Sequence, residues 1–202
     1  MAPCVCVLTI ASSTTKDKFP LPKIDTCLDT LNGCEFFSTC DLHWGYWQTE
    51  IDERDCDRTA FVTHKRQWRF KVLSFGLANA PSQFAQIMEL VMSGLTYDVC
   101  LVYLDDILIF SKTFDDHLDR LATVFDRLDC YTLKLKPSKC SLFQRKVSFL
   151  GHVVSSQGIK CDPEKVATIA MWPTPSSIVE VRTFCGLASY YRTFICNFAA
   201  IA

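Results

Sequence analysis

A largely hydrophobic segment near the middle of the chain is interrupted by two adjacent carboxylates. Residues 99–110 read Val-Cys-Leu-Val-Tyr-Leu-Asp-Asp-Ile-Leu-Ile-Phe, with Asp105 and Asp106 at the centre. The segment is too short to span a membrane, and its β-favouring residues predict two buried strands joined by a tight turn that carries both carboxylates. A surface hairpin with an Asp-Asp turn is the alternative, but such a hairpin alternates apolar with polar residues, and this segment does not.

Hydrophobic residues at helical spacing predict three helices, and helix caps predict two more. One spans residues 24–31, a second has Pro81 in its first turn, and a third spans residues 114–128. Two more follow residue 161, the first capped by Asp162 and the last running from a Ser177–Glu180 capping box to residue 194. We expect the apolar stripes of the second and third helices to be core. These stripes are Phe84, Ile87, Met88, Val91, Met92 and Leu95, and then Phe114, Leu118, Leu121, Phe125 and Leu128.

Strand patterns occupy much of the remaining chain. They cover residues 4–11, 34–42, 48–61 and 68–73, and a pair of strands lies within residues 134–155. The order of strands and helices predicts an α+β fold, a sheet with helices on one face. The pattern becomes helical near residue 158, which is the candidate domain boundary.

Composition and charge permit a globular domain without identifying its partner. The chain has 202 residues, is 49% hydrophobic and carries a formal net charge of -1. Such a chain can bury a real core, and clustering of charge matters more than the total. Basic clusters within residues 64–71 and 134–146, and an acidic stretch at residues 50–57 that offsets the first, are expected to be solvated faces. The 12 cysteines include no Cys-x-x-Cys pair and are expected to be reduced thiols.

A third carboxylate points to chemistry. Asp41 also lies near the end of a predicted strand, so its strand end and that of Asp105 can meet at one edge of the sheet. Carboxylates held close together repel one another, and divalent cations relieve that repulsion. Three carboxylates converging there are suited to two magnesium ions, which clamp the attacking and leaving oxygens of a phosphoryl displacement.

Sequence motifs along the chain resemble one family. Residues 103–106 read Tyr-Leu-Asp-Asp, residues 38–46 read Ser-Thr-Cys-Asp-Leu-His-Trp-Gly-Tyr, and residues 75–81 read Phe-Gly-Leu-Ala-Asn-Ala-Pro. Further matches include Phe-Leu-Gly-His at residues 149–152 and Trp-Pro-Thr-Pro at residues 172–175. From residue 14 to residue 202 the chain resembles the reverse transcriptase of gypsy-class LTR retrotransposon Pol polyproteins.

The resemblance implies a fold and a set of site residues. The fold would be a polymerase palm, an antiparallel sheet with helices on one face, with partial fingers and the start of a thumb. Asp41, Asp105 and Asp106 would be catalytic and would bind two Mg²⁺ ions, with Mn²⁺ as a substitute. Tyr46 would exclude a ribose 2′-hydroxyl, and Lys139 would protonate the departing pyrophosphate. The substrate-binding residues implied are Tyr46, Phe75, Gly76, Asn79, Pro81 and Lys139, and the primer grip is Phe149, Leu150, Gly151 and His152.

Individually, several of these residues have plainer interpretations. Tyr46 alone would be a core aromatic residue, Gly76 and Pro81 are ordinary at a helix entry, Lys139 can be an idle surface lysine, and His152 can be a structural histidine. Lys134, Lys136, Arg145 and Lys146 are candidate contacts to nucleic-acid phosphate.

The resemblance also implies domains and partners. Residues 1–18 would be a remnant of the fingers, residues 19–157 the palm with inserted fingers strands at about 51–73, and residues 158–202 the start of the thumb. The partners implied are an RNA template, a primer and deoxynucleoside triphosphates, with no membrane and with the RNase H and integrase segments of Pol absent. We expect an intracellular, cytoplasmic location with nuclear access, because the apolar N-terminal stretch lacks the basic residues of a secretion signal.

Some positions depart from the family pattern. Cys6-Val7-Leu8 stands where the family has Asp-Tyr-Arg, whose arginine grips the triphosphate. Ser74 replaces a proline, Trp44 replaces a small residue, and Arg66 stands where a glycine usually turns the chain. Two hypotheses follow: an active RNA-directed DNA polymerase domain, or a truncated, catalytically inactive retroelement remnant that at most binds nucleic acid.

Overall fold

The computed structural model describes residues 15–17, 19–20 and 22–201, which form two compact units. The first unit runs to Gln144 and the second from Arg145. The strand predicted at residues 4–11 and the Cys6–Leu8 element lie outside the described residues. No helix in the described part of the chain is long and apolar enough to cross a bilayer.

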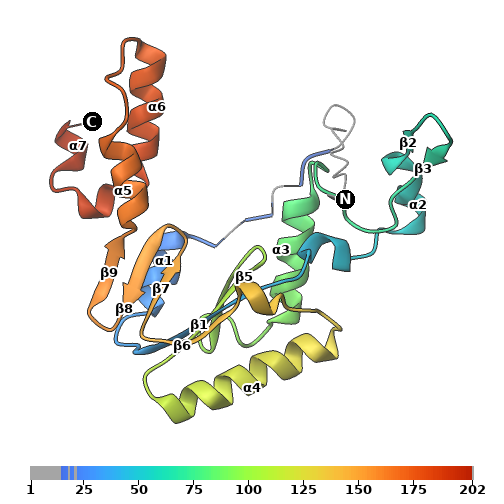
Figure 1. Cartoon of the computed structure of the whole chain (residues 1–202), viewed down its shortest axis with the longest axis horizontal. Coiled ribbons are helices and arrows are strands. Elements are labelled where there is room, and N and C mark those ends of the chain that lie inside the picture. Colours follow the sequence, from blue (N-terminus) through green and yellow to red (C-terminus); the bar gives the residue numbers. More distant parts are fainter. Residues whose placement is uncertain (1–14, 18, 21, 202) are drawn as a thin grey trace. The chain divides into compact units, whose positions relative to one another are not determined.

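The first unit is built on a four-stranded antiparallel sheet in the order β4-β5-β1-β6 (Figure 1). The strands are β1 (Phe36–Asp41), β4 (Cys100–Tyr103), β5 (Asp106–Ser111) and β6 (Ser141–Gln144). Helices α1 (Ile24–Thr30), α3 (Ala80–Val91) and α4 (Phe114–Cys130) accompany it. The predicted buried hairpin, the strand that delivers Asp41 and these three helices are confirmed.

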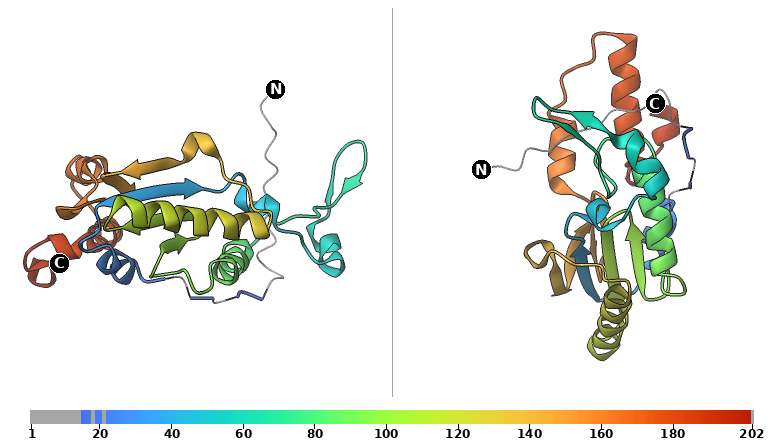
Figure 2. Two further views of the ribbon diagram at one scale, coloured as in Figure 1. Left: turned by 90° about the horizontal axis from the view of Figure 1, so that it is seen from below. Right: turned by 90° about the vertical axis from the view of Figure 1, so that its right-hand side faces the viewer.

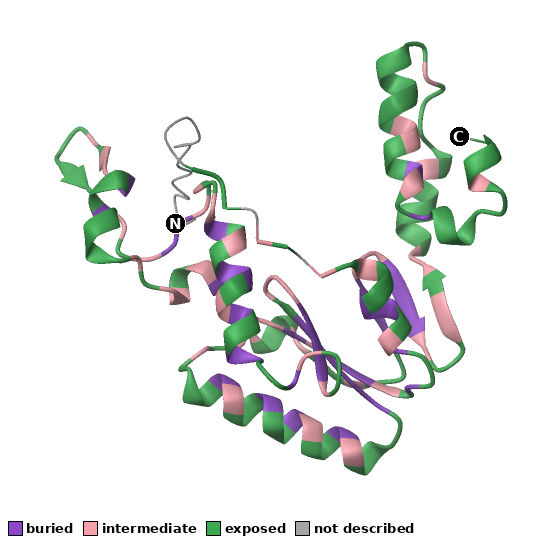
Figure 3. Cartoon of the chain, turned by 180° about the vertical axis from the view of Figure 1, so that it is seen from behind, coloured by how far each residue is buried: buried purple, intermediate pink, exposed green. Residues whose placement is uncertain are grey.

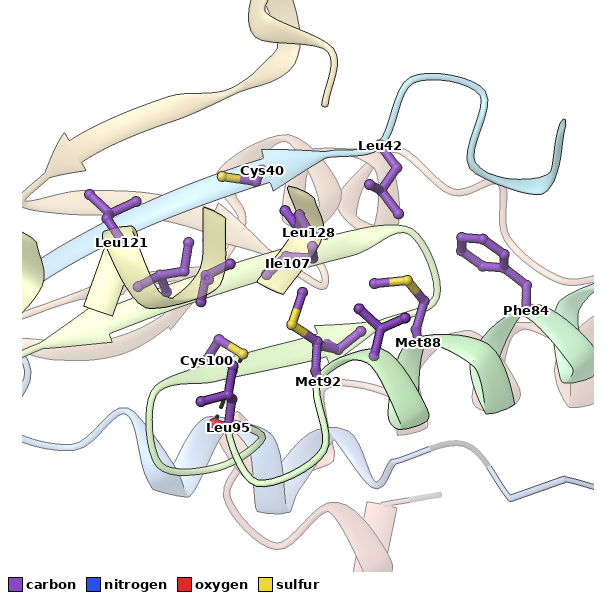
Figure 4. Close-up of a cluster of buried hydrophobic side chains, with 14 residues drawn as sticks. Cys40, Leu42, Phe84, Met88, Met92, Leu95, Cys100, Ile107, Leu121 and Leu128 are labelled. Carbon is purple, nitrogen blue, oxygen red and sulfur yellow. Dashed lines mark hydrogen bonds between the residues drawn. The ribbon is translucent and has the colours of Figure 1, made fainter. Parts of the chain in front are cut away.

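Helices α3 and α4 pack on one face of this sheet (Figure 4). Cys40, Ile107 and Val102 lie side by side across β1, β5 and β4 and therefore share that face. Their buried cluster includes Phe84, Met88, Val91 and Met92 from the α3 segment, and Leu121, Val124 and Leu128 from α4. The α3 stripe is core as predicted.

The α4 stripe is only partly core, which corrects the prediction. Leu121 and Leu128 are buried, but Phe114, Leu118 and Phe125 are 47%, 45% and 37% exposed. Buried, intermediate and exposed residues alternate along the ribbon of α4 (Figure 3). The helix buries a neighbouring stripe instead, to which His117 and Val124 belong. The two stripes lie only about 40–60° apart around the helix, and residue spacing alone does not tell which of them is buried.

The segment between β1 and α3 was predicted as two longer strands, and this prediction is wrong. It contains η1 (Gly45–Gln48), α2 (Glu53–Cys56), η2 (Asp57–Thr59) and a small hairpin of β2 (Phe61–Val62) and β3 (Gln67–Trp68). A helix starts because the Asp52 carboxylate accepts a hydrogen bond from the Arg54 backbone N–H at 3.0 Å. Beyond β3, only an isolated bridge between Glu50 and Val72 remains of the second strand.

The second unit has a sheet of its own, with strands in the order β7-β8-β9. These are β7 (Lys146–Phe149), β8 (His152–Ser155) and β9 (Gly158–Cys161). The sequence predicted a pair of strands within residues 134–155, but the structure has three there: β6, which follows η3 (Pro137–Lys139), β7 and β8. Helices α5 (Pro163–Ala170), α6 (Ile178–Ser189) and α7 (Phe198–Ile201) follow, with η4 (Arg192–Phe194) between the last two. The last predicted helix therefore ends earlier than expected. The palm, fingers and thumb boundaries stay predictions.

Candidate active site

The strand register brings the three predicted carboxylates to one end of the first sheet. Asp41 is the last residue of β1 and pairs directly with Asp106, the first residue of β5. Tyr103 pairs with Asp106 on the other side, so Leu104 and Asp105 form the turn, one residue earlier than the sequence suggested. Leu104 has a φ of 56°, a left-handed conformation that costs a non-glycine residue about 1 kcal/mol. The buried strands on both sides hold this turn in place.

A pocket of about 200 Å³ opens at this end of the sheet. Its wall includes Asp41, Tyr46, Phe75, Asp105, Lys136 and Lys139. Residues more than 60 positions apart along the chain therefore face one space, as the sequence predicted for Asp41 and Asp105.

Close packing behind the pocket depends on Gly45, which was not singled out from the sequence. A Cβ atom on this residue would lie 2.9 Å from Cζ of Phe84 and 3.5 Å from Cβ of Asp105. The distance to Asp105 is an ordinary contact, but a side chain here would press on the Phe84 ring, so glycine lets the chain after Asp41 approach α3 closely. The available signal was a glycine flanked by two aromatic residues within the motif that ends at Tyr46.

Charge is unevenly balanced around the three carboxylates. The Lys139 ammonium donates a hydrogen bond to Oδ2 of Asp41 at 2.8 Å, and this contact raises the pKa of Lys139. The pKa of Asp106 is raised by partial desolvation and then by the charges of Asp105 and Asp41, which Lys139 partly offsets. A site with more carboxylate than ammonium charge suits a divalent cation. Among the described residues, no three candidate ligands are already gathered as a metal site.

Tyr46 stands between the carboxylates and the core. Its ring packs edge-on against Phe75 and Phe84, with ring centroids 5.4 and 5.1 Å away. Partial burial raises the pKa of Tyr46, and the negative charge of Asp105 adds to that shift. The phenol is therefore a neutral, fixed wall of the pocket.

The predicted residues around the start of α3 separate into two groups. Phe75 lines the pocket, whereas Gly76, Asn79 and Pro81 do not belong to its wall. The Asn79 side chain donates to the Thr15 carbonyl at 2.8 Å and accepts from the Asp17 N–H at 3.1 Å. Its contacts in the structure are thus with the preceding segment. Gly76 has a φ of 90° and Pro81 lies in the first turn of α3, as helix-entry residues do.

The predicted primer grip forms the turn between β7 and β8 in the second unit. Leu150 and Gly151 have φ values of 49° and 71°. The Tyr190 hydroxyl donates to the Leu150 carbonyl at 2.6 Å, and the Tyr191 hydroxyl to the Gly151 carbonyl at 3.4 Å. His152 is 3% exposed and lies among the rings of Tyr190, Tyr191 and Phe194.

Comparison with known proteins identifies the family. Residues 4–154 match the family model described as reverse transcriptase (RNA-dependent DNA polymerase). The chain belongs to the reverse transcriptase family, which confirms the resemblance found in the sequence.

Two relatives show which members of this family the chain is similar to. The chain is 42% identical over 189 residues to the retrovirus-related Pol polyprotein from transposon 297 and 40% identical to that from transposon gypsy, both of Drosophila melanogaster. Each alignment covers 94% of this chain and 18% of the polyprotein, so the chain spans less than a fifth of these relatives. The gypsy-class similarity is therefore confirmed.

Solved structures confirm the fold. The foamy viral protease-reverse transcriptase dRH in complex with double-stranded DNA superimposes with a TM-score of 0.83 and 26% identity, over 93% of this chain and 33% of that one. A second foamy viral protease-reverse transcriptase, also with double-stranded DNA, gives a TM-score of 0.72 and 27% identity over 81% of this chain and 34% of that one. The α+β architecture is that of reverse transcriptases.

Proposed function

We propose that this chain is an RNA-directed DNA polymerase domain that joins deoxynucleoside triphosphates to the 3′ end of a primer. The observation that carries the proposal is the register that pairs Asp41 with Asp106 beside Asp105, at a pocket lined by Tyr46, Phe75 and Lys139. Membership of the reverse transcriptase family supports this assignment.

We infer that Asp41, Asp105 and Asp106 hold two Mg²⁺ ions, for which Mn²⁺ can substitute. Carboxylate oxygens are the ligands that Mg²⁺ prefers, and reverse transcriptases generally depend on divalent metals. When bound, the ions would supply charge stabilisation to the attacking 3′ oxygen and to the leaving pyrophosphate. The Lys139 ammonium lies 2.8 Å from Oδ2 of Asp41, so it would stand beside a phosphate held at that carboxylate. A protonated lysine beside a leaving pyrophosphate is suited to act as its general acid.

Tyr46 is proposed to select deoxyribonucleotides. Its ring is held on two sides by Phe75 and Phe84, so it cannot turn aside for a ribose 2′-hydroxyl. The other predicted substrate residues, Gly76, Asn79 and Pro81, would act by shaping the segment that carries Phe75. Their side-chain contacts favour this indirect role over direct contact with a nucleotide.

The partners of the proposed reaction are an RNA template and a primer. Phe149, Leu150, Gly151 and His152 would position the primer end, and Lys134, Lys136, Arg145 and Lys146 would meet backbone phosphate. His152 would contribute by stiffening its turn, because it is buried among aromatic rings. The alternative of an inactive remnant is not favoured, since 94% of the chain aligns with Pol polyproteins at about 40% identity.

Primer extension tests the proposal. The chain is incubated with a labelled DNA primer on an RNA template, Mg²⁺ and deoxynucleoside triphosphates. Asp105→Asn removes a metal ligand while nearly preserving its shape, and we expect about a 10³-fold loss of rate, since such charge stabilisation is worth several kcal/mol. Asp126→Asn, an exposed change on α4, is the matched control and should retain full activity. Equal incorporation by the wild-type and Asp105→Asn proteins would refute the proposal.

A further inference from the structure

The β2–β3 hairpin carries a basic tip, Thr63–Trp68, that the proposed reaction does not use. It stands clear of the four-stranded sheet of its own unit (Figure 2). His64, Lys65, Arg66 and Trp68 are all exposed. From the sequence, the acidic stretch at residues 50–57 was expected to offset this basic cluster.

The structure shows that nearby arginines pair with most of that acidic stretch. Asp52 pairs with Arg54 at 2.6 Å, and Asp55 pairs with Arg58 at 3.2 Å. Arg69 pairs with Asp57 at 2.5 Å and with Glu53 at 3.7 Å. Within the described part of the chain, Lys65 and Arg66 make no ion pair. The tip therefore keeps a local positive charge although the whole chain is nearly neutral.

The turn at the tip is fixed by Thr63 without a glycine. The Thr63 backbone N–H donates to the Arg66 carbonyl at 3.0 Å, and its hydroxyl donates to the same oxygen at 2.9 Å. The same hydroxyl accepts a hydrogen bond from the Arg66 N–H at 3.3 Å. Arg66 is thus accommodated where the family usually has glycine, and its side chain becomes available at the tip.

An aromatic surface accompanies this charge. The Arg66 guanidinium lies over the Trp68 ring, 4.5 Å from its centroid, and Trp68 remains 46% exposed. Nucleobases stack both on aromatic rings and on guanidinium planes, and cations beside them bind the phosphates. Duplex ends aside, only unpaired bases present a free face for such stacking. An acidic peptide satisfies the charge but leaves the aromatic surface unused.

We propose that the tip is a binding site for single-stranded nucleic acid, with Lys65 and Arg66 on the phosphates and a base stacked at Trp68. The inference deepens the proposed function, because an unpaired template strand is the single strand available to such an enzyme. Binding of a single strand to the tip nevertheless requires no catalysis. The proposal for the tip and the proposed polymerase function can therefore be refuted separately.

Fluorescence anisotropy with a labelled 12-nucleotide single strand tests this site. It is measured on the full chain carrying Asp105→Asn, without nucleotides, using oligo-U and oligo-dT in separate arms. We expect Trp68→Ala to weaken binding about tenfold and Trp68→Phe to restore most of it, because stacking tolerates any aromatic ring. Lys65→Ala with Arg66→Ala should lower the slope of log affinity against log salt by about 1.4, or 0.7 for each lost phosphate contact. The matched control, Lys16→Ala with Lys112→Ala, removes equal charge from exposed sites of the same unit.

Three outcomes would overturn the site. One is equal weakening by the control pair, which would mean that only net charge matters. Another is an unchanged affinity in Trp68→Ala whose far-ultraviolet circular dichroism matches the parent. The third is competition by polyglutamate as effective as competition by the unlabelled strand, which would indicate a general polyanion surface. The same tip substitutions are also made in the chain that retains Asp105. Primer extension by these variants at saturating template tests the proposed polymerase function independently of binding at the tip.

Discussion

Two tight turns in this molecule each place a leucine in the left-handed region, yet their surroundings differ. At the turn between β4 and β5, Leu104 precedes Asp105 and Asp106, and repulsion among the carboxylates helps to raise the pKa of Asp106. At the turn between β7 and β8, the carbonyls of Leu150 and Gly151 accept hydrogen bonds from two tyrosines. The first turn keeps charge that a ligand can neutralise, whereas the protein itself satisfies the second.

This difference separates a site prepared for a ligand from a structural support. Substitutions at the second turn should lower stability, because they remove contacts that are already made. Substitutions at the first turn should remove function while leaving stability unchanged or improved. The following tests are ordered by the size of the expected effect.

The largest expected effect on stability is at His152. Replacing it with alanine leaves a cavity among Tyr190, Tyr191 and Phe194, and we expect a loss of about 2–3 kcal/mol from the second unit. Urea unfolding followed by circular dichroism measures this loss. His64→Ala, at an exposed position, is the control and should change little. A loss below about 0.5 kcal/mol would mean that the rings close over the gap, and that the second turn is less rigid than its contacts suggest.

Magnesium should stabilise the first turn selectively. At ten times the dissociation constant, one bound ion adds about 1.4 kcal/mol to the folded state. Thermal melting should therefore shift upward with Mg²⁺ in the wild-type chain and not in Asp105→Asn. An equal shift in both proteins would place the ion elsewhere. Chelation should reverse the shift in the wild-type protein.

Sequence patterns predicted the first turn to within one residue because the signals of the hairpin are local. An apolar run broken by Asp105 and Asp106 predicts the hairpin, and Asp41 at a strand end predicts its partner. The Lys139 contact with Asp41 spans 98 positions, and no pattern within a window of the sequence reports such a pair. Likewise, the requirement for Gly45 arises from Phe84 on another element.

Errors in the prediction have similar causes. Asp52 was read as part of a strand over residues 48–61, although an aspartate at that position also starts a helix by capping it. Phe125 and Leu121 have the same spacing pattern on α4, but only contact with the sheet decides which of them is buried. Periodicity identifies an apolar face, and tertiary contact selects its buried part.

A smaller effect is expected from the tyrosine that closes the second turn. Tyr190→Phe removes the hydroxyl that donates to the Leu150 carbonyl, and we expect a loss of about 1 kcal/mol because the carbonyl loses its partner. Thermal unfolding measures the change, and Tyr131→Phe on an exposed tyrosine serves as the control. If both variants melt alike, solvent replaces the hydroxyl and the second turn is held by ring packing alone.

The smallest expected effect is the sharpest test of the comparison between the two turns. A substitution at the first turn should raise the stability of the chain, whereas substitutions at the second turn should lower it. Asp106→Asn removes one of the mutually repelling carboxylates, so without metal the chain should gain stability, by less than about 0.5 kcal/mol after solvent screening. A carboxyl whose pKa is raised on folding binds its proton more readily in the folded state, so its ionisation costs stability as the pH rises through that pKa. The gain in stability should therefore be present near neutral pH and vanish below pH 3.8, the ordinary pKa of this carboxyl in the unfolded chain. Unfolding curves of both proteins at pH 7 and pH 3.5, each with a chelator, measure it. A loss of stability at pH 7 would mean that Asp106 supports the turn, and that the two turns do not differ in the way proposed.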